Sequence, residues 1–212
     1  MIEKLTPEEF NEFSKNHEQG TFFESSYWGE LKSFTGWVSH LVGIKQDGKI
    51  VAATLLLGKK IPVLGKYIYY APRGFLIDYT NYYLLEKFVT EITKYVKKNK
   101  GIFIKINPYV EYRKRDINGN PVSDETNRNI IDKLEHLGFT HNGYEKYNLY
   151  GITGNFNEEN ENYGLFDFKR GFNADVVELI GEFTLITNKF SYKLYKIMLK
   201  IYQKTKKRVK KW

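Results

Sequence analysis

The most constraining feature of the sequence is an amphipathic segment at residues 80–98 that lies between two short runs typical of β-strands. Its apolar residues recur at the spacing of one helix face: Leu84, Leu85, Phe88, Val89, Ile92, Tyr95 and Val96. The flanking runs, at residues 66–70 and 102–106, are rich in Tyr and Ile. This strand–helix–strand order predicts a domain that contains both a sheet and packed helices.

The N-terminal part of the chain predicts two helices and a hairpin. Thr6 and Glu9 match the two ends of a capping box, with proline at the first helical position between them. A second helix is expected to begin near Ser25. Two β-rich runs, at residues 37–45 and 49–57, flank an Asp-Gly pair that is typical of hairpin turns.

The pattern after the central unit is less regular. Residues 111–122 are polar and rich in turn formers, and they are predicted to form a loop. A helix is expected at residues 124–137, strands within residues 139–149 and at 176–186, and a final amphipathic helix near Phe190. We therefore predict an α/β (α+β) fold with a mixed central sheet. Its element order is compatible with a GNAT-like acyltransferase fold, as a single domain followed by a C-terminal helix.

Composition excludes several classes of protein. The chain has 212 residues, of which 42% are hydrophobic and 27% charged, as in a globular domain with a sizeable core. It has no cysteine, which excludes disulfides and Cys-based zinc sites, and its four histidines lack metal-ligand spacing. We expect no metal. No apolar run reaches the roughly 20 residues that span a bilayer, and no signal peptide opens the chain, so we expect a cytoplasmic protein.

The net positive charge is concentrated near the C-terminus. The formal charge is +8, and the last ten residues carry no acid but six basic side chains: Lys204, Lys206, Lys207, Arg208, Lys210 and Lys211. Three roles for this basic segment are open. It binds the phosphates of a nucleic acid, makes peripheral contact with an anionic membrane, or is simply solvated.

Two blocks of sequence resemble one known family. The first block holds FFESSYWGELK at residues 22–32 and YAPRG at residues 70–74, followed by KINPY at residues 105–109. The second holds YNLYGITGNF at residues 147–156 and YGLFDFKRGF at residues 163–172. Together they are similar to the N-terminal and C-terminal signatures of the FemABX family, the aminoacyltransferases that build the interpeptide bridges of peptidoglycan.

The resemblance also implies that the chain is shortened. Family members are about twice as long and are usually built from two GNAT-like domains. Here residues 1–142 resemble the first domain, residues 143–188 resemble the end of the second, and residues 189–212 form the amphipathic helix and basic tail. We interpret this as an internal deletion that fused the two ends. If the ends have merged into one domain, residues 176–186 should pair with the first domain's sheet.

The resemblance implies a reaction and its partners. Family members transfer an amino acid from aminoacyl-tRNA to the stem peptide of a peptidoglycan precursor, which is either lipid II or a UDP-linked muropeptide. The function implied here is therefore cell-wall bridge formation by a cytoplasmic transferase. The alternative is a catalytically inactive, shortened member that binds the precursor or tRNA, because the middle of the family pattern is missing.

Lys169 is the candidate catalytic residue. It follows Phe168 in the pair that resembles the family's reactive-site lysine, and its ammonium group would stabilise the oxyanion or the leaving ribose oxygen. Phe168 is expected to pack or to line the cleft, where it is one candidate for binding the precursor. Without the motif, a surface lysine on a short helix is the simpler interpretation of Lys169.

Three further residues are candidates for binding the precursor. Lys32 lies one helical turn after Trp28, and the resemblance implies a contact with the diphosphate; the alternative is a solvated lysine on the helix surface. Trp28 itself fits a core position better than a ligand platform. Arg73 follows a proline in a turn, where a guanidinium group holds phosphate or pairs with a nearby carboxylate.

We expect no cofactor. The Arg/Gln-x-x-Gly-x-Gly/Ala loop, with which CoA-dependent GNAT enzymes bind pyrophosphate, is absent from the sequence. This argues against acetyl-CoA. The glycines at positions 151, 154, 164 and 171 also lack the strand–GxGxxG–helix context of a dinucleotide site.

Overall fold

The computed structural model describes residues 1–143, 159, 164, 167–168 and 176–209. The strands in this part of the chain are β1 (Glu3–Lys4), β2 (Trp37–Gln46), β3 (Lys49–Ile61), β4 (Lys66–Ala71), β5 (Gly101–Ile106), β6 (Glu111–Arg115), β7 (Phe139–His141), β8 (Val176–Leu179) and β9 (Phe183–Ile186). The α-helices are α1 (Pro7–Asn16), α2 (Ser26–Ser33), α3 (Tyr82–Lys98), α4 (Arg128–His136) and α6 (Lys189–Val209). Two short 3₁₀ helices are η1 (Phe22–Glu24) and η2 (Pro62–Leu64).

The main sheet is mixed, and its described strands have the order β1-β2-β3-β4-β5-β9-β7. β2 and β3 form the predicted hairpin, in which Asp47 and Gly48 both have positive φ, as a tight turn of this kind requires. β4 runs parallel to β5, and α3 makes the connection between them. All other pairs in the sheet are antiparallel. The predicted α/β class with a mixed central sheet is confirmed.

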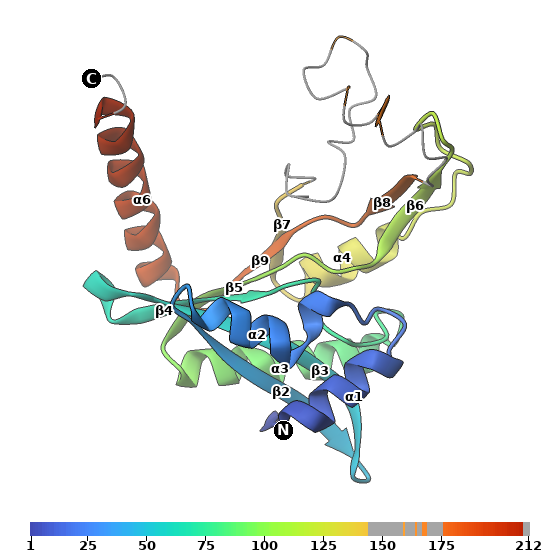
Figure 1. The fold of residues 1–212 in the computed structure, drawn as a ribbon, viewed down its shortest axis with the longest axis horizontal. Coiled ribbons are helices and arrows are strands. Elements are labelled where there is room, and N and C mark those ends of the chain that lie inside the picture. The colour runs from blue at the N-terminus through green and yellow to red at the C-terminus, as the bar shows by residue number, and fades with distance from the viewer. Residues whose placement is uncertain (144–158, 160–163, 165–166, 169–175, 210–212) are drawn as a thin grey trace.

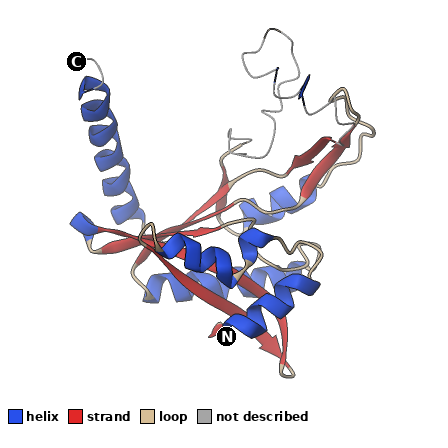
Figure 2. Ribbon diagram, viewed as in Figure 1, coloured by secondary structure: helices blue, strands red, loops and turns tan. Residues whose placement is uncertain are grey.

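Helices cover both faces of the sheet (Figure 2). Alternate residues of β3 point to opposite sides, as the twofold period of a strand dictates. Leu56 packs in the larger cluster with apolar residues of α3 and α4. Leu55 and Leu57 pack in a smaller cluster with Phe10 of α1 and Trp28 of α2. The sheet is therefore the middle layer, with α3 and α4 on one face and α1 and α2 on the other.

The C-terminal block joins the sheet of the N-terminal block. β9 lies between β5 and β7 and pairs antiparallel with both, while β8 pairs with β6 in a separate two-stranded sheet. Figure 1 shows these late strands beside the yellow and green elements of the first block. The division into residues 1–142, 143–188 and 189–212 stays a prediction.

Several expected elements differ from the structure. The single strand expected at residues 176–186 is two strands, because Gly181 has a φ of +92° and turns the chain between them. The loop expected at residues 111–122 begins with β6, which pairs with a strand far away in sequence. The helix expected from residue 124 begins at Arg128, and β1 was not expected. The predicted helix start at Thr6 is confirmed, with both hydrogen bonds of the capping box present.

The last helix, α6, extends away from the body of the molecule (Figure 1). Its first turns pack on β5, where the rings of Tyr192 and Tyr195 contact the ring of Phe103. None of the helices within the described residues is both long and apolar enough to cross a bilayer.

Candidate functional site

A cleft of about 600 Å³ lies where α2, β4, β5, β9 and the start of α6 meet. Its lining is aromatic and polar and comes from both blocks of the sequence. The residues are Phe23, Trp28, Lys32, Trp37, Ile68, Tyr69, Tyr70, Pro72, Arg73, Phe103, Lys105, Asn107, Asn142, Glu182, Thr184, Tyr192, Tyr195, Lys196 and Leu199. Three of the four predicted precursor-binding residues therefore line one cavity.

Helix α2 positions Trp28 and Lys32 on the same wall. Ser25 caps the helix, and its Oγ accepts a hydrogen bond from the backbone N–H of Trp28 at 3.1 Å. Residues four apart lie on one helix face, so the Nζ of Lys32 sits 4.5 Å from the ring centroid of Trp28. The ring of Trp28 also packs edge-on against Phe22 and Phe23, at centroid distances of 5.8 and 5.0 Å. Trp28 is thus both a packing residue and the platform beneath the ammonium group.

The turn after β4 aims Arg73 into the cleft. Arg73 has a φ of +58°, and its backbone N–H donates to Oδ1 of Asn107 at 3.0 Å. Its guanidinium group lies 5.4 Å from the ring centroid of Phe23 and 5.2 Å from that of Tyr109. No ion pair joins Arg73 to a carboxylate in the described part of the chain.

The floor of the cleft holds an ion pair that the sequence reasoning did not single out. The Nζ of Lys105, on β5, lies 2.7 Å from Oε1 of Glu182, which precedes β9. Asn142 fixes this carboxylate, because its Nδ2 donates to Oε1 of Glu182 at 3.1 Å and to Oγ1 of Thr184 at 2.8 Å. These partners are distant in sequence. The available signal was Lys105 itself, a lysine inside an otherwise apolar strand. Burying a lysine has a high free-energy cost unless the charge is paired, so a carboxylate partner was to be expected.

Tyr70 is a neutral hydrogen-bond donor in the cleft. Its hydroxyl donates to Oδ1 of Asn107 at 2.9 Å. Burial raises the pKa of Tyr70 to about 12, and the negative charge of Glu182 adds to the effect. The side chain of Asn107 therefore joins the Arg73 turn to the end of β4.

The other predicted site residues are not brought to this cleft by the described part of the chain. Phe168 is 65% exposed and is not among the residues that line the cavity. Lys169, Lys210 and Lys211 lie outside the described residues. Lys204, Lys206, Lys207 and Arg208 belong to α6, but their side chains are not described. Their roles stay predictions.

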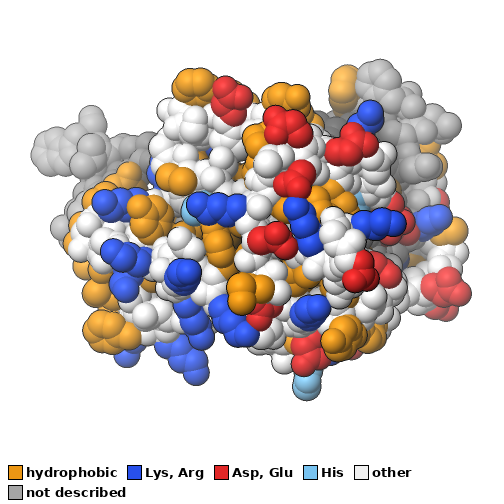
Figure 3. All heavy atoms as spheres, turned by 90° about the horizontal axis from the view of Figure 1, so that it is seen from below, with side chains coloured by type: hydrophobic (Ala, Val, Ile, Leu, Met, Phe, Trp, Pro, Cys, Tyr) orange, Lys and Arg blue, Asp and Glu red, His pale blue; other side chains and the backbone are white. Residues whose placement is uncertain are grey.

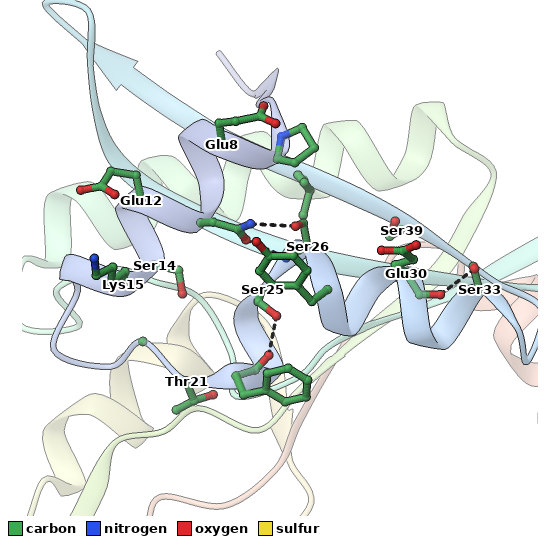
Figure 4. A pocket seen from close by; sticks show the side chains of 16 residues that line it. Glu8, Glu12, Ser14, Lys15, Thr21, Ser25, Ser26, Glu30, Ser33 and Ser39 are labelled. Atoms are coloured by element: carbon green, nitrogen blue, oxygen red, sulfur yellow. Dashed lines mark hydrogen bonds between the residues drawn. The ribbon is translucent and has the colours of Figure 1, made fainter.

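A second hollow lies between α1 and α2, on the other side of α2 from the cleft (Figure 4). Some of its hydroxyl groups are held by local hydrogen bonds. The Oγ of Ser25 donates to the carbonyl of Phe22 at 2.7 Å, and that of Ser26 accepts from Nδ2 of Asn11 at 2.8 Å. No cluster of three or more metal-ligating side chains occurs among the residues that the structure describes. The convergent cationic and aromatic groups place the candidate site in the first cleft.

The fold and the cleft define an α/β protein with a mixed sheet and a basic, aromatic cleft, and comparison with known proteins refines this class. A sequence profile of the FemAB family matches residues 5–146 and 142–200, so the chain belongs to that family. Aminoacyltransferase FemA of Staphylococcus aureus, in strains MW2 and bovine RF122 / ET3-1, is 36% identical over 143 residues, which cover 67% of this chain.

The structural comparison agrees with the family. A crystal structure of FemX superimposes with a TM-score of 0.58 at 29% sequence identity, covering 68% of this chain and 33% of that chain. The chain spans about a third of the length of the curated relatives it matches, since the alignment covers 34% of each FemA protein.

Proposed function

We propose that the chain transfers an amino acid from aminoacyl-tRNA to the stem peptide of a peptidoglycan precursor in the cytoplasm. The observation that carries this proposal is the cleft in which Lys32 and Arg73, from the first block, face Glu182 and Thr184, from the second. Both blocks are required to build it. Membership of the FemAB family and the name of the FemA relatives support the same reaction class.

The chemistry asks for few groups. An amine of the stem peptide attacks the ester carbonyl of the aminoacyl-tRNA, the C–N bond of the amide forms, and the ester C–O bond breaks. The ribose hydroxyl leaves, taking up the proton that the amine loses. Lys32 and Arg73 are the proposed groups that hold the diphosphate of the precursor by charge-assisted hydrogen bonds. Lys169 is the proposed donor to the oxyanion that develops on the ester carbonyl.

The proposal predicts transfer that depends on these lysines. Purified protein is incubated with radiolabelled glycyl-, alanyl- and seryl-tRNA and with either lipid-linked or UDP-linked precursor, and label in the precursor is measured. Lys169→Ala should lower the rate by about 100-fold or more, the loss typical of one oxyanion donor. Lys32→Ala should weaken precursor binding by about tenfold or more, because a charge-assisted hydrogen bond is lost.

Lys49→Ala, an exposed lysine on the β2–β3 hairpin, is the matched control and should behave as the parent protein does. Precursor binding without any transfer by folded protein would reject the enzyme and assign a binding module instead. Equal loss of binding in the Lys32 and Lys49 variants would reject the placement of the precursor in this cleft.

A further inference from the structure

Helix α6 presents two different faces. One face packs on the body through Tyr192 and Tyr195, and with Lys196 and Leu199 it forms a wall of the cleft. The helix therefore has a fixed rotation about its own axis for at least its first three turns. This packing determines which residues of α6 face away from the body.

The opposite face is an apolar stripe that no part of the chain described by the structure covers. Phe190, Leu194, Ile197 and Ile201 follow the spacing of one helix face, and between 38% and 79% of each residue is exposed. Single exposed apolar side chains are common on protein surfaces, but a continuous stripe over three turns marks a contact with another apolar phase or partner.

The charge of α6 selects the kind of partner. The helix has lysine in each of its turns and neither Asp nor Glu anywhere along it. Lys193 and Lys200 are exposed and flank the stripe on one side. The face of the body seen in Figure 3 differs, because it carries acidic side chains as well as basic ones. An apolar stripe bordered by lysines on one side, on a helix without any acidic residue, is complementary to an anionic lipid surface. The acyl chains take up the stripe, and the headgroups pair with the lysines.

We propose that α6 lies flat on an anionic membrane surface, with Phe190, Leu194, Ile197 and Ile201 inserted at the headgroup boundary. The opposite face of the same helix lines the cleft, so this docking would hold the cleft beside the membrane. The inference does not rest on the transferase activity, because lipid binding is measured without any transfer.

Co-sedimentation with vesicles tests this surface. The full chain should bind vesicles of phosphatidylglycerol and phosphatidylcholine in equal parts and should not bind phosphatidylcholine alone. Ile197→Ser/Ile201→Ser should weaken binding by about tenfold or more, because two side chains no longer gain from leaving water. The matched control is Val122→Ser/Val177→Ser, which changes two exposed apolar residues near the β6–β8 sheet and should bind as the parent does.

The charge contribution is tested separately. Lys193→Gln/Lys200→Gln should weaken binding by about tenfold or more at low salt, and high salt should weaken the parent in the same way. Circular dichroism confirms that each variant is folded.

Three results would overturn the proposal. The first is no binding to anionic vesicles, and the second is binding that the Ile197→Ser/Ile201→Ser change leaves intact. The third is a chain that does not bind vesicles but self-associates or binds tRNA through α6. Self-association would make the stripe a contact between two copies of the chain, and tRNA binding would make the helix an RNA-binding surface.

Discussion

Glu24 is completely buried, and neither oxygen of its carboxyl group has a hydrogen-bond partner of good geometry among the described residues. Burial raises its pKa from the ordinary 4.5 to about 9, and the positive charge of Arg73 opposes the rise only in part. The carboxyl group is therefore protonated at neutral pH. Glu24 is the last residue of η1. In sequence it follows Phe22 and Phe23, whose rings pack on Trp28, and it precedes α2, the helix that carries Lys32.

The buried carboxyl group predicts a specific pH dependence of stability. Between pH 4.5 and about 9 the folded chain retains a proton at Glu24 that the unfolded chain releases. The contribution of this proton to the free energy of unfolding is complete below pH 4.5 and is lost progressively up to about pH 9. By pH 7 the free energy of unfolding is lower by about 3 kcal/mol. Glu24→Gln cannot ionise, so its free energy of unfolding should exceed that of the parent increasingly as the pH rises. Urea denaturation over this pH range measures the difference.

Glu30→Gln is the control, because Glu30 is exposed on α2 and its variant should follow the parent at every pH. Curves for the parent and Glu24→Gln that run parallel from acid to alkaline pH would show that the carboxyl group is solvated or paired.

At this scale the sequence predicted only part of the site. Trp28, Lys32 and Arg73 were found because they lie in short motifs, and the structure places all three on one cleft. Glu24 lies in the same motif, but no local pattern indicates that its side chain is buried without a partner. Lys105 and Glu182 were missed for a related reason. Their ion pair forms only because β5 and β9 are neighbours in the sheet, and the local sequence around either residue does not indicate this pairing.

Among the elements, β9 contributes more to the fold than its four residues suggest. It pairs with β5 on one side and with β7 on the other, and Phe183 is fully buried in the main core cluster. The ring of Phe183 stacks against the imidazole of His141 at a centroid distance of 4.7 Å. Loss of this side chain would leave a cavity between two strands from the first block.

Phe183→Ala should therefore lower the free energy of unfolding by about 3–5 kcal/mol. Val177→Ala in β8 is the comparison, since Val177 is half exposed, and it should cost less than about 1 kcal/mol. Chemical denaturation followed by circular dichroism gives both values. Similar losses for the two variants would mean that β9 is no more central than β8.

The prediction of elements succeeded where the signal was local. α1 and the β2–β3 hairpin follow from a capping box and an Asp-Gly turn, and α3 follows from its apolar spacing. β6 was predicted to be a loop because its sequence, EYRKR, is polar, and it becomes a strand only through its pairing with β8. There Arg115 and Arg113 both pair with Glu178, at 2.7 and 3.5 Å, so the strand is stabilised by charges on its partner.

For the whole molecule, the C-terminal block is part of the core. A chain shortened to residues 1–143 would lose Ile180, Phe183 and Leu185, which are all buried in the main cluster. Each contributes about 1.5–3 kcal/mol of burial, which together approaches the roughly 5–15 kcal/mol that keeps an ordinary domain folded. We expect the shortened chain to unfold without a cooperative transition and to bind a hydrophobic dye. A sharp thermal transition like that of the parent would show that the first block folds alone.

The strands β7 and β9 also determine how the chain between them can vary. The backbone N–H of Asn142, just after β7, donates to the carbonyl of Glu182, just before β9, at 2.8 Å. The end of β7 and the start of β9 are therefore held together by this hydrogen bond, independently of the length of the connecting segment. Each doubling of the length of a flexible connecting segment costs only about 0.6 kcal/mol in loop-closure entropy. Evolution can lengthen or shorten the chain at this junction while the sheet and its cleft stay the same.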